Sequence, residues 1–200
     1  MAFKKAPASK VEIPAMNLKV FHVELEGTSS LICHNWDEKT RRQMLGKQMG
    51  EAQAAQEKKD PNLCFKNSLY PIPGEKNAFG FPAVGFKSAA VDACSHVAGI
   101  TKVEARGAFH ITQDLVPIDG VPTPRTDMVR IGMGTADVRI RGEFLTWKAT
   151  LTIRHNASVL TAAQIVNLFD TAGFAVGIGE WRPEKNGSHG MFRVTRSIEQ

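Results

Sequence analysis

An amphipathic helix near the C-terminus, with a loop and one strand after it, is the sequence feature that most limits the fold of this chain. Thr161 and Gln164 have the spacing of a capping box, in which two side chains satisfy the first free backbone amides of a helix. The residues that follow place one apolar stripe on that helix: Ile165, Val166, Leu168, Phe169 and Ala172. We predict that Gly173 caps the helix and that a strand follows over 189–198. A helix that is apolar on one face must pack against a sheet or another helix.

A second helix and further strands are predicted upstream of this unit. Apolar residues at helical spacing after Pro82 predict a helix that should pack on a sheet. Alternation of apolar and polar residues predicts strands at 16–25, at 108–111 and between about 128 and 154, with a bend or bulge near 142–144. In order, these elements read strand, helix, strand, strand, helix, strand. We therefore predict an α+β fold with a ferredoxin-like or RRM-like βαββαβ core and with insertions after the first strand.

The length of 200 residues and the 42% content of hydrophobic residues suit one elaborated domain. Residues 1–15 are predicted to form a flexible basic arm, and residues 16–200 a single domain. The stretch at about 37–80 begins with good helix formers. Four prolines follow between Pro61 and Pro82, at the end of the stretch. We interpret this stretch as an insertion that contains a polar surface helix and a Pro-rich loop or hairpin.

Composition narrows the possible partners. The chain has 25 Lys and Arg against 20 Asp and Glu, a net charge of +5, which permits nucleic acid as a partner without requiring it. Three cysteines without a Cys-x-x-Cys pair indicate neither a disulfide framework nor a zinc knuckle, and they favour a cytoplasmic location. The histidines lack the spacing of a metal-binding helix, and no nucleotide or hydrolase motif is present. We expect no metal, no cofactor and no membrane partner.

Residues 173–190, here called the Gly-rich loop, carry five glycines among basic and aromatic residues. Glycine allows positive φ and the close approach of another backbone, and basic side chains donate hydrogen bonds to phosphate. A tryptophan in such a loop can stack on a base. The predicted binding residues of the loop are Gly177, Gly179, Trp181, Arg182, Lys185 and His189. The simpler alternative is that Gly173 only caps a helix and that Asn186-Gly187 only forms a turn.

Two local patterns carry a resemblance to a known family. One is Val176-Gly-Ile-Gly179, followed by a basic stretch and by Gly190-Met-Phe-Arg-Val194; the other is the Pro-led helix start Phe81-Pro-Ala-Val-Gly-Phe-Lys-Ser88. Over about residues 16–36 and 79–197 the chain resembles the RAMP superfamily, the RNA-binding proteins of CRISPR effector complexes with a ferredoxin-like or RRM-like core. The resemblance implies that Lys87 faces the bound strand. Ala83-Val-Gly85 departs from the small hydroxyl residues of the family, which leaves the ligand in doubt.

The run Trp181-Arg-Pro-Glu-Lys185 is also similar to phage and prophage proteins, which implies a stand-alone cytoplasmic protein, in the host cytoplasm if phage-encoded. The favoured hypothesis is non-enzymatic binding of single-stranded RNA or DNA, as a homo-oligomer or a nucleoprotein subunit, with several copies along the strand in a phage or CRISPR-like context. Arg139 and Arg141 occupy polar-facing positions of the predicted central strands, where a basic sheet face could follow a phosphate backbone. Charges that serve only solubility are the alternative there. Trp147 is predicted to lie in the core.

Two other hypotheses stay open. In some RAMP proteins a loop after the first strand bears a catalytic aspartate that cuts target RNA, and Asp37 is a candidate for this role with His34 as acid or base. Asp37 is more simply explained as the N-cap of the following helix. The other hypothesis is a phage protein that binds or inhibits another protein. The sequence favours a protein that is not an enzyme but does not decide this.

Overall fold

The computed structural model describes residues 14–36, 38–51, 59–131 and 135–199. Within these ranges the protein is a mixed α+β fold with antiparallel sheets and five α-helices, so the predicted class is confirmed. The strands are β1 (Leu18–Gly27), β2 (Leu31–Cys33), β3 (Tyr70–Pro71), β4 (Phe79–Pro82), β5 (Phe109–Ile111), β6 (Leu115–Asp119), β7 (Pro122–Ile131), β8 (Thr135–Phe144), β9 (Lys148–Asn156) and β10 (Phe192–Glu199). The helices are α1 (Glu38–Gln48), α2 (Pro61–Ser68), α3 (Ala83–Ala93), α4 (Lys102–Ala108) and α5 (Ala162–Ala175), with 3-10 turns at Cys94–His96 and Pro183–Lys185.

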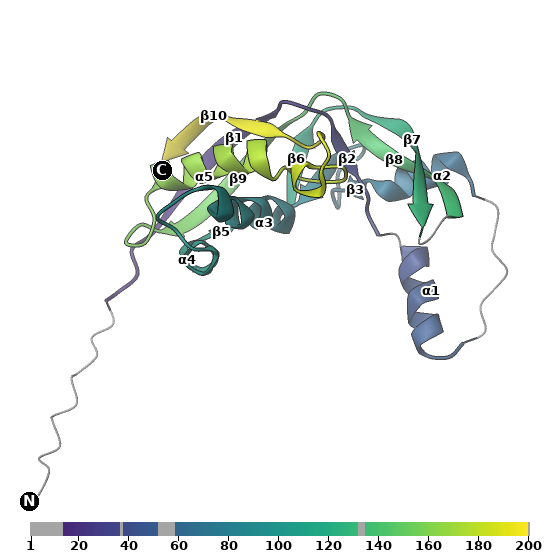
Figure 1. The fold of residues 1–200 in the computed structure, drawn as a ribbon, viewed down its shortest axis with the longest axis horizontal. Helices are drawn as coiled ribbons and strands as arrows, with labels where there is room; N and C mark the ends of the chain where they lie inside the picture. The colour runs from purple at the N-terminus through teal and green to yellow at the C-terminus, as the bar shows by residue number, and fades with distance from the viewer. Residues whose placement is uncertain (1–13, 37, 52–58, 132–134, 200) are drawn as a thin grey trace, which may run out of the picture.

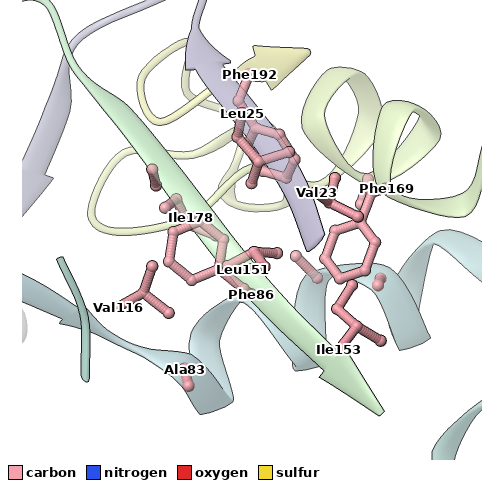
Figure 2. Packing of buried hydrophobic residues seen from close by; sticks show 14 of the residues in the cluster. Val23, Leu25, Ala83, Phe86, Val116, Leu151, Ile153, Phe169, Ile178 and Phe192 are labelled. Atoms are coloured by element: carbon pink, nitrogen blue, oxygen red, sulfur yellow. The ribbon is translucent and has the colours of Figure 1, made fainter. Parts of the chain in front are cut away.

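The larger sheet has seven strands in the order β10-β1-β9-β6-β4-β3, and β5 also pairs with β9. The strand β1 lies between β9 and β10 and is antiparallel to both. Its residues Phe21, Val23 and Leu25 are buried, whereas the residues between them face the other side of the sheet. Helices α3 and α5 lie together on the buried side (Figure 1), where Phe86 and Phe169 pack against the strands (Figure 2).

The predicted start of α5 is confirmed, but its predicted end is wrong. The Thr161 hydroxyl accepts from the Gln164 amide at 3.2 Å, and the Gln164 side chain accepts from the Thr161 amide at 2.9 Å. The helix then continues through Gly173 to Ala175, so Gly173 is not its cap. A Cβ at this glycine would lie 1.9 Å from the Phe192 carbonyl oxygen. Gly173 therefore lets β10 approach the helix closely.

Several elements were not among the predicted ones. Residues Pro117 to Pro124 belong mostly to β6 and β7, because sheet pairing outweighs the turn preference of their prolines. The helix α4 was missed, although Thr101 and Glu104 form a complete capping box at its start. The insertion contains the predicted helix and hairpin as α1 and β3–β4, and also α2, which Asp60 caps.

A smaller sheet with the order β2-β8-β7 projects from the core at the end away from the C-terminus, beside α2 (Figure 1). Strands β7 and β8 pair along their full length as a two-stranded ribbon. Arg139 and Arg141 lie on β8 in this sheet, so their predicted place in the central sheet is wrong. Trp147 is 2% exposed, which confirms its prediction as a core residue. None of the described helices is both long and apolar enough to cross a membrane.

Candidate nucleic-acid interface

The Gly-rich loop folds tightly against the end of β1 and against β2. The amide of Glu180 donates to the Ile32 carbonyl at 3.1 Å, and the amide of Gly190 donates to the Ser30 carbonyl at 2.7 Å. Gly179 has φ +76°, and a Cβ there would lie 2.6 Å from the Ile32 carbonyl oxygen. Gly177 also has positive φ, 68°. The glycines thus allow another backbone to approach, as predicted, but that backbone belongs to the protein itself.

The side chain of Arg182 turns back onto its own loop. Its Nη1 donates to the Gly179 carbonyl at 3.1 Å, and its Nε donates to Glu184 Oε2 at 2.9 Å. These contacts hold the 3-10 turn at Pro183–Lys185 and neutralise the guanidinium charge. Trp181 is 45% exposed and has φ +56°, a conformation that non-glycine residues adopt rarely. Lys185 is exposed at the tip of the loop.

His189 begins a chain of polar contacts that leads from the Gly-rich loop to the β7–β8 ribbon. Its Nδ1 lies 2.9 Å from the Ser30 hydroxyl, which donates to Glu143 Oε1 at 2.6 Å. Arg125 donates to the same carboxylate oxygen at 2.9 Å and, through Nε, to Asp127 at 2.9 Å. His189 therefore connects the Gly-rich loop to the β7–β8 ribbon.

Arg141 completes this network and is 3% exposed, so it is not the surface cation that we predicted. Its Nη1 lies 3.4 Å from Asp127 Oδ2, and its Nη2 lies 3.6 Å from Glu180 Oε2. Glu180 Oε1 in turn lies 3.4 Å from His34 Nδ1. The hydrogen bond from His34, together with the charge of Arg141, lowers the pKa of Glu180. The carboxylate therefore stays ionised at neutral pH.

His34 lines two cavities. The first, of about 310 Å³, lies between α3 and the Gly-rich loop. Its charged lining includes Asp92, Glu180 and Glu184 beside Arg182. Because three carboxylates outnumber one guanidinium here, this cavity is poorly suited to an anion.

The second cavity, of about 370 Å³, lies between the insertion and β8, and we call it the Trp36 groove. Trp36 is 53% exposed at this groove. Lys59 and Arg139 both contact Asp137, and Arg139 Nε lies 3.8 Å from its carboxylate. The remaining polar lining consists mainly of hydroxyl and amide side chains: Asn35, Thr40, Asn67 and Ser68. An aromatic ring, cations and amides therefore share one open groove.

The other predicted site residues lie elsewhere. Lys87 does not face the Gly-rich loop, since its Nζ donates to the Arg106 carbonyl at 3.0 Å and contacts His110 at the edge of the larger sheet. Asp37 lies outside the described residues, so its roles as catalyst and as N-cap remain predictions. Trp36 was missed, although it stands directly before Asp37 in the run from His34 that we considered for catalysis.

A cavity on the side of the larger sheet that faces away from α3 and α5 is not basic. It has a volume of about 720 Å³ and is lined by Glu24, Glu26, Glu75 and Asp119, and by Lys148. Glu26 forms ion pairs with Lys148 and Arg193, at 3.8 Å and 2.7 Å. In this part of the sheet, carboxylates and ion pairs thus take the place of the predicted cationic surface.

No family model and no curated protein matches the chain. Among solved structures, the chain is similar to a chain in the structure described as "Cryo-EM structure of the Type III-B Cmr-beta bound to cognate target RNA". The sequence identity is 13%, the TM-score is 0.45, and the match covers 91% of this chain. It covers 61% of the neighbour, so this chain spans less than two thirds of that protein's length. We therefore base the functional assignment on this chain's own residues.

Proposed function

We propose that the protein binds single-stranded nucleic acid without cutting it, and that the strand passes through the Trp36 groove. The observation that carries this proposal is an exposed Trp36 in the same groove as Arg139 and Lys59. Single strands bind proteins by stacking bases on aromatic rings and by placing phosphates near cations, and each stacked base contributes about 1–3 kcal/mol. The amide side chain of Asn67 adds a group that can hydrogen-bond to a base edge.

The charges of the groove favour an anionic ligand. Asp137 is shared by Lys59 and Arg139, so two cations face one carboxylate. The hydrogen bond from Lys59 lowers the pKa of Asp137, which keeps this residue ionised at neutral pH. A net positive charge remains next to the indole ring. A phosphate can take the place of Asp137 as partner of Arg139 without leaving that carboxylate unpaired.

The Gly-rich loop contributes to the proposed interface in two ways. Through Glu180 it fixes His34 and Arg141 at the border of the groove. Lys185 and Trp181 are exposed on the loop, and we propose them as further contacts with the strand. Gly177, Gly179, Arg182 and His189 then act by holding the loop in shape.

We further propose that the core is ferredoxin-like and that the RAMP resemblance reflects common descent. The strand order supports this proposal, because β1 lies between β10 and β9 while β5 flanks β9, all antiparallel. Helices α3 and α5 precede β5 and β10 in the chain, as a βαββαβ unit requires. A phage or CRISPR-like setting, a cytoplasmic location and assembly in several copies along the strand belong to the same proposal.

Fluorescence anisotropy with labelled 30-nucleotide RNA and DNA strands tests the proposed binding. We expect Trp36→Ala and Arg139→Ala each to weaken binding about tenfold, as the loss of one stacked base or one phosphate contact predicts. Arg196→Ala is the matched control, because it removes one exposed cation of β10 outside the groove. Equal weakening by Arg139→Ala and Arg196→Ala would contradict a defined groove. Absence of salt-sensitive binding by the wild type would contradict the function itself.

Cleavage of the strand is the second candidate function, and the pair of His34 and Glu180 favours it. The imidazole lines both cavities and lies 3.4 Å from the carboxylate, a geometry that suits a general acid or base. Gel analysis of labelled RNA after long incubation tests it, with Asp37→Ala and His34→Ala as variants. Product that disappears in both variants would support an endoribonuclease. RNA that stays intact with the wild type would exclude this reaction under the conditions used.

A further inference from the structure

Three basic side chains from separate elements meet at an edge of the larger sheet, far from the Trp36 groove. Lys87 of α3 places its Nζ 2.9 Å from His110 Nδ1 on β5. His110 stands directly opposite Arg154 of β9 in the antiparallel register, so their side chains lie on the same face. We call Lys87, His110 and Arg154 the basic cluster.

The charges of the basic cluster are not balanced by acidic side chains. In the part of the chain that the structure describes, none of the three residues forms an ion pair with a carboxylate. Two carboxylates that precede His110 in the chain are engaged elsewhere: Asp92 pairs with Lys102 at 2.6 Å, and Glu104 accepts from the Thr101 hydroxyl at 2.7 Å.

The pKa values reflect this imbalance. Burial lowers the pKa of Lys87. Burial, and then the charges of Lys87 and Arg154, lower the pKa of His110. Burial disfavours the charged form at both residues, and at His110 two nearby cations without a compensating anion add to this effect.

The hydrogen bond between Lys87 and His110 orients the donors outward. A protonated Lys87 donates to Nδ1, so the neutral imidazole carries its proton on Nε2 and can donate through that atom. Lys87 keeps a further proton after donating to His110 and to the Arg106 carbonyl. The Arg154 guanidinium adds its own donors on the same face.

We propose that the basic cluster is a phosphate-binding site, formed by Lys87, His110 and Arg154. This proposal depends on the proposed function in one respect: the phosphate that binds is a phosphate of the nucleic-acid strand. Figure 1 places β5 and α4 at the opposite end of the molecule from the β7–β8 ribbon that borders the Trp36 groove. The cluster is thus a second contact, separate from the groove.

Titration of the histidine side-chain signals by NMR tests the proposal with two probes, inorganic phosphate and an unlabelled 30-nucleotide DNA strand. Phosphate should raise the pKa of His110 in a saturable way, since a bound anion stabilises the imidazolium. The DNA strand should also raise the pKa of His110 in a saturable way. The signal of His22, on β1 of the same sheet, is the internal control and should not follow the same saturation curve.

The variants Lys87→Gln and Arg154→Gln should remove the response of His110 to both probes. Each should also reduce the salt slope of strand binding by about 0.7, the value for one lost phosphate contact on a single strand. If His110 responds to phosphate but not to the strand, the site takes a free phosphate and its assignment to the strand is wrong. If neither probe moves the pKa of His110, the proposal is overturned.

Failure of this site and failure of the proposed function give different results. Trp36→Ala should weaken strand binding while the response of His110 to inorganic phosphate stays unchanged. A strand that binds through the Trp36 groove without any change at His110 contradicts the basic cluster alone. A phosphate response at His110 without any strand binding contradicts the proposed function and leaves the basic cluster as a site for free phosphate.

Discussion

Arg141 on β8 lies 3.6 Å from Glu180 in the Gly-rich loop, measured from Nη2 to Oε2. This contact joins two segments that are far apart in the sequence. On one side Arg141 is held by Asp127 of the ribbon, and on the other side Glu180 is held to His34. The border of the Trp36 groove therefore depends on a buried ion network.

The buried position of Arg141 predicts that it supports stability. Arg141→Ala should lower the free energy of unfolding by about 1.5–3 kcal/mol, because it removes a charged hydrogen-bond partner of the mostly buried Asp127, which keeps Arg125. Arg139→Ala, two residues away and half-exposed, should change the free energy by less than about 1 kcal/mol. Urea denaturation of the two variants measures both values. Similar losses from both would show that the network does not stabilise the fold.

The lowered pKa of Glu180 predicts a pH dependence. A carboxyl group with a lower pKa in the folded state stabilises the protein above its unfolded pKa of about 4.3, and this contribution is lost as the pH falls through the folded value. Glu180→Gln should thus be less stable than the wild type at pH 7, by less than about 1 kcal/mol because solvent screens this part-exposed group. The stability difference between the two proteins should disappear as the pH falls below the lowered pKa of Glu180. A difference that persists at low pH would contradict an electrostatic origin.

The conformation of Gly179 predicts a strong response to a single methyl group. Gly179→Ala should destabilise the protein by about 1–3 kcal/mol, because φ is positive and the Cβ would meet the Ile32 carbonyl. Gly107 in α4 has open space around it, so Gly107→Ala should stabilise the protein by about 0.5–1 kcal/mol. Thermal unfolding monitored by circular dichroism measures the change in stability of both variants. Equal effects would mean that the loop tolerates other backbone conformations.

The three cysteines should differ in reactivity. Cys33 is fully buried, and burial raises the pKa of its thiol to about 12. Cys64 is only partly buried and lines the Trp36 groove. Iodoacetamide at pH 8 should therefore modify Cys64 before Cys33, as peptide mass spectrometry can show. A bound DNA strand should slow the reaction of Cys64. Early modification of Cys33 in the folded protein would contradict its burial.

Local signals in the sequence predicted the elements well where a few neighbouring residues decide the structure. Thr161 and Gln164 define the start of α5 because both partners of the capping box lie within one turn. The core position of Trp147 followed from apolar residues of the same stretch. The class of the fold was predictable for the same reason, since period and order of the elements are properties of short segments.

The missed features depend on contacts between distant segments. In the sequence Gly173 has the position of a helix cap. In the folded protein the Phe192 carbonyl of β10 packs against it. Lys87 matches a motif locally, yet its side chain turns to His110 because α3 packs beside the edge of the sheet. Trp36 gave no periodic signal, since its importance comes from a groove that the insertion and β8 form together.

The sequence by itself determined an α+β protein with a net positive charge and a glycine-dependent loop before its last strand. Only the tertiary structure decided which cations are available to a ligand. Arg141 and Arg182 are paired with carboxylates and Arg139 shares Asp137 with Lys59, whereas Lys87 and Arg154 form no ion pair in the part of the chain that the structure describes. The physical reason is that a charge is neutralised by the opposite charges that folding places within about 4 Å of it. For residues far apart in the sequence, this distance cannot be read from their spacing.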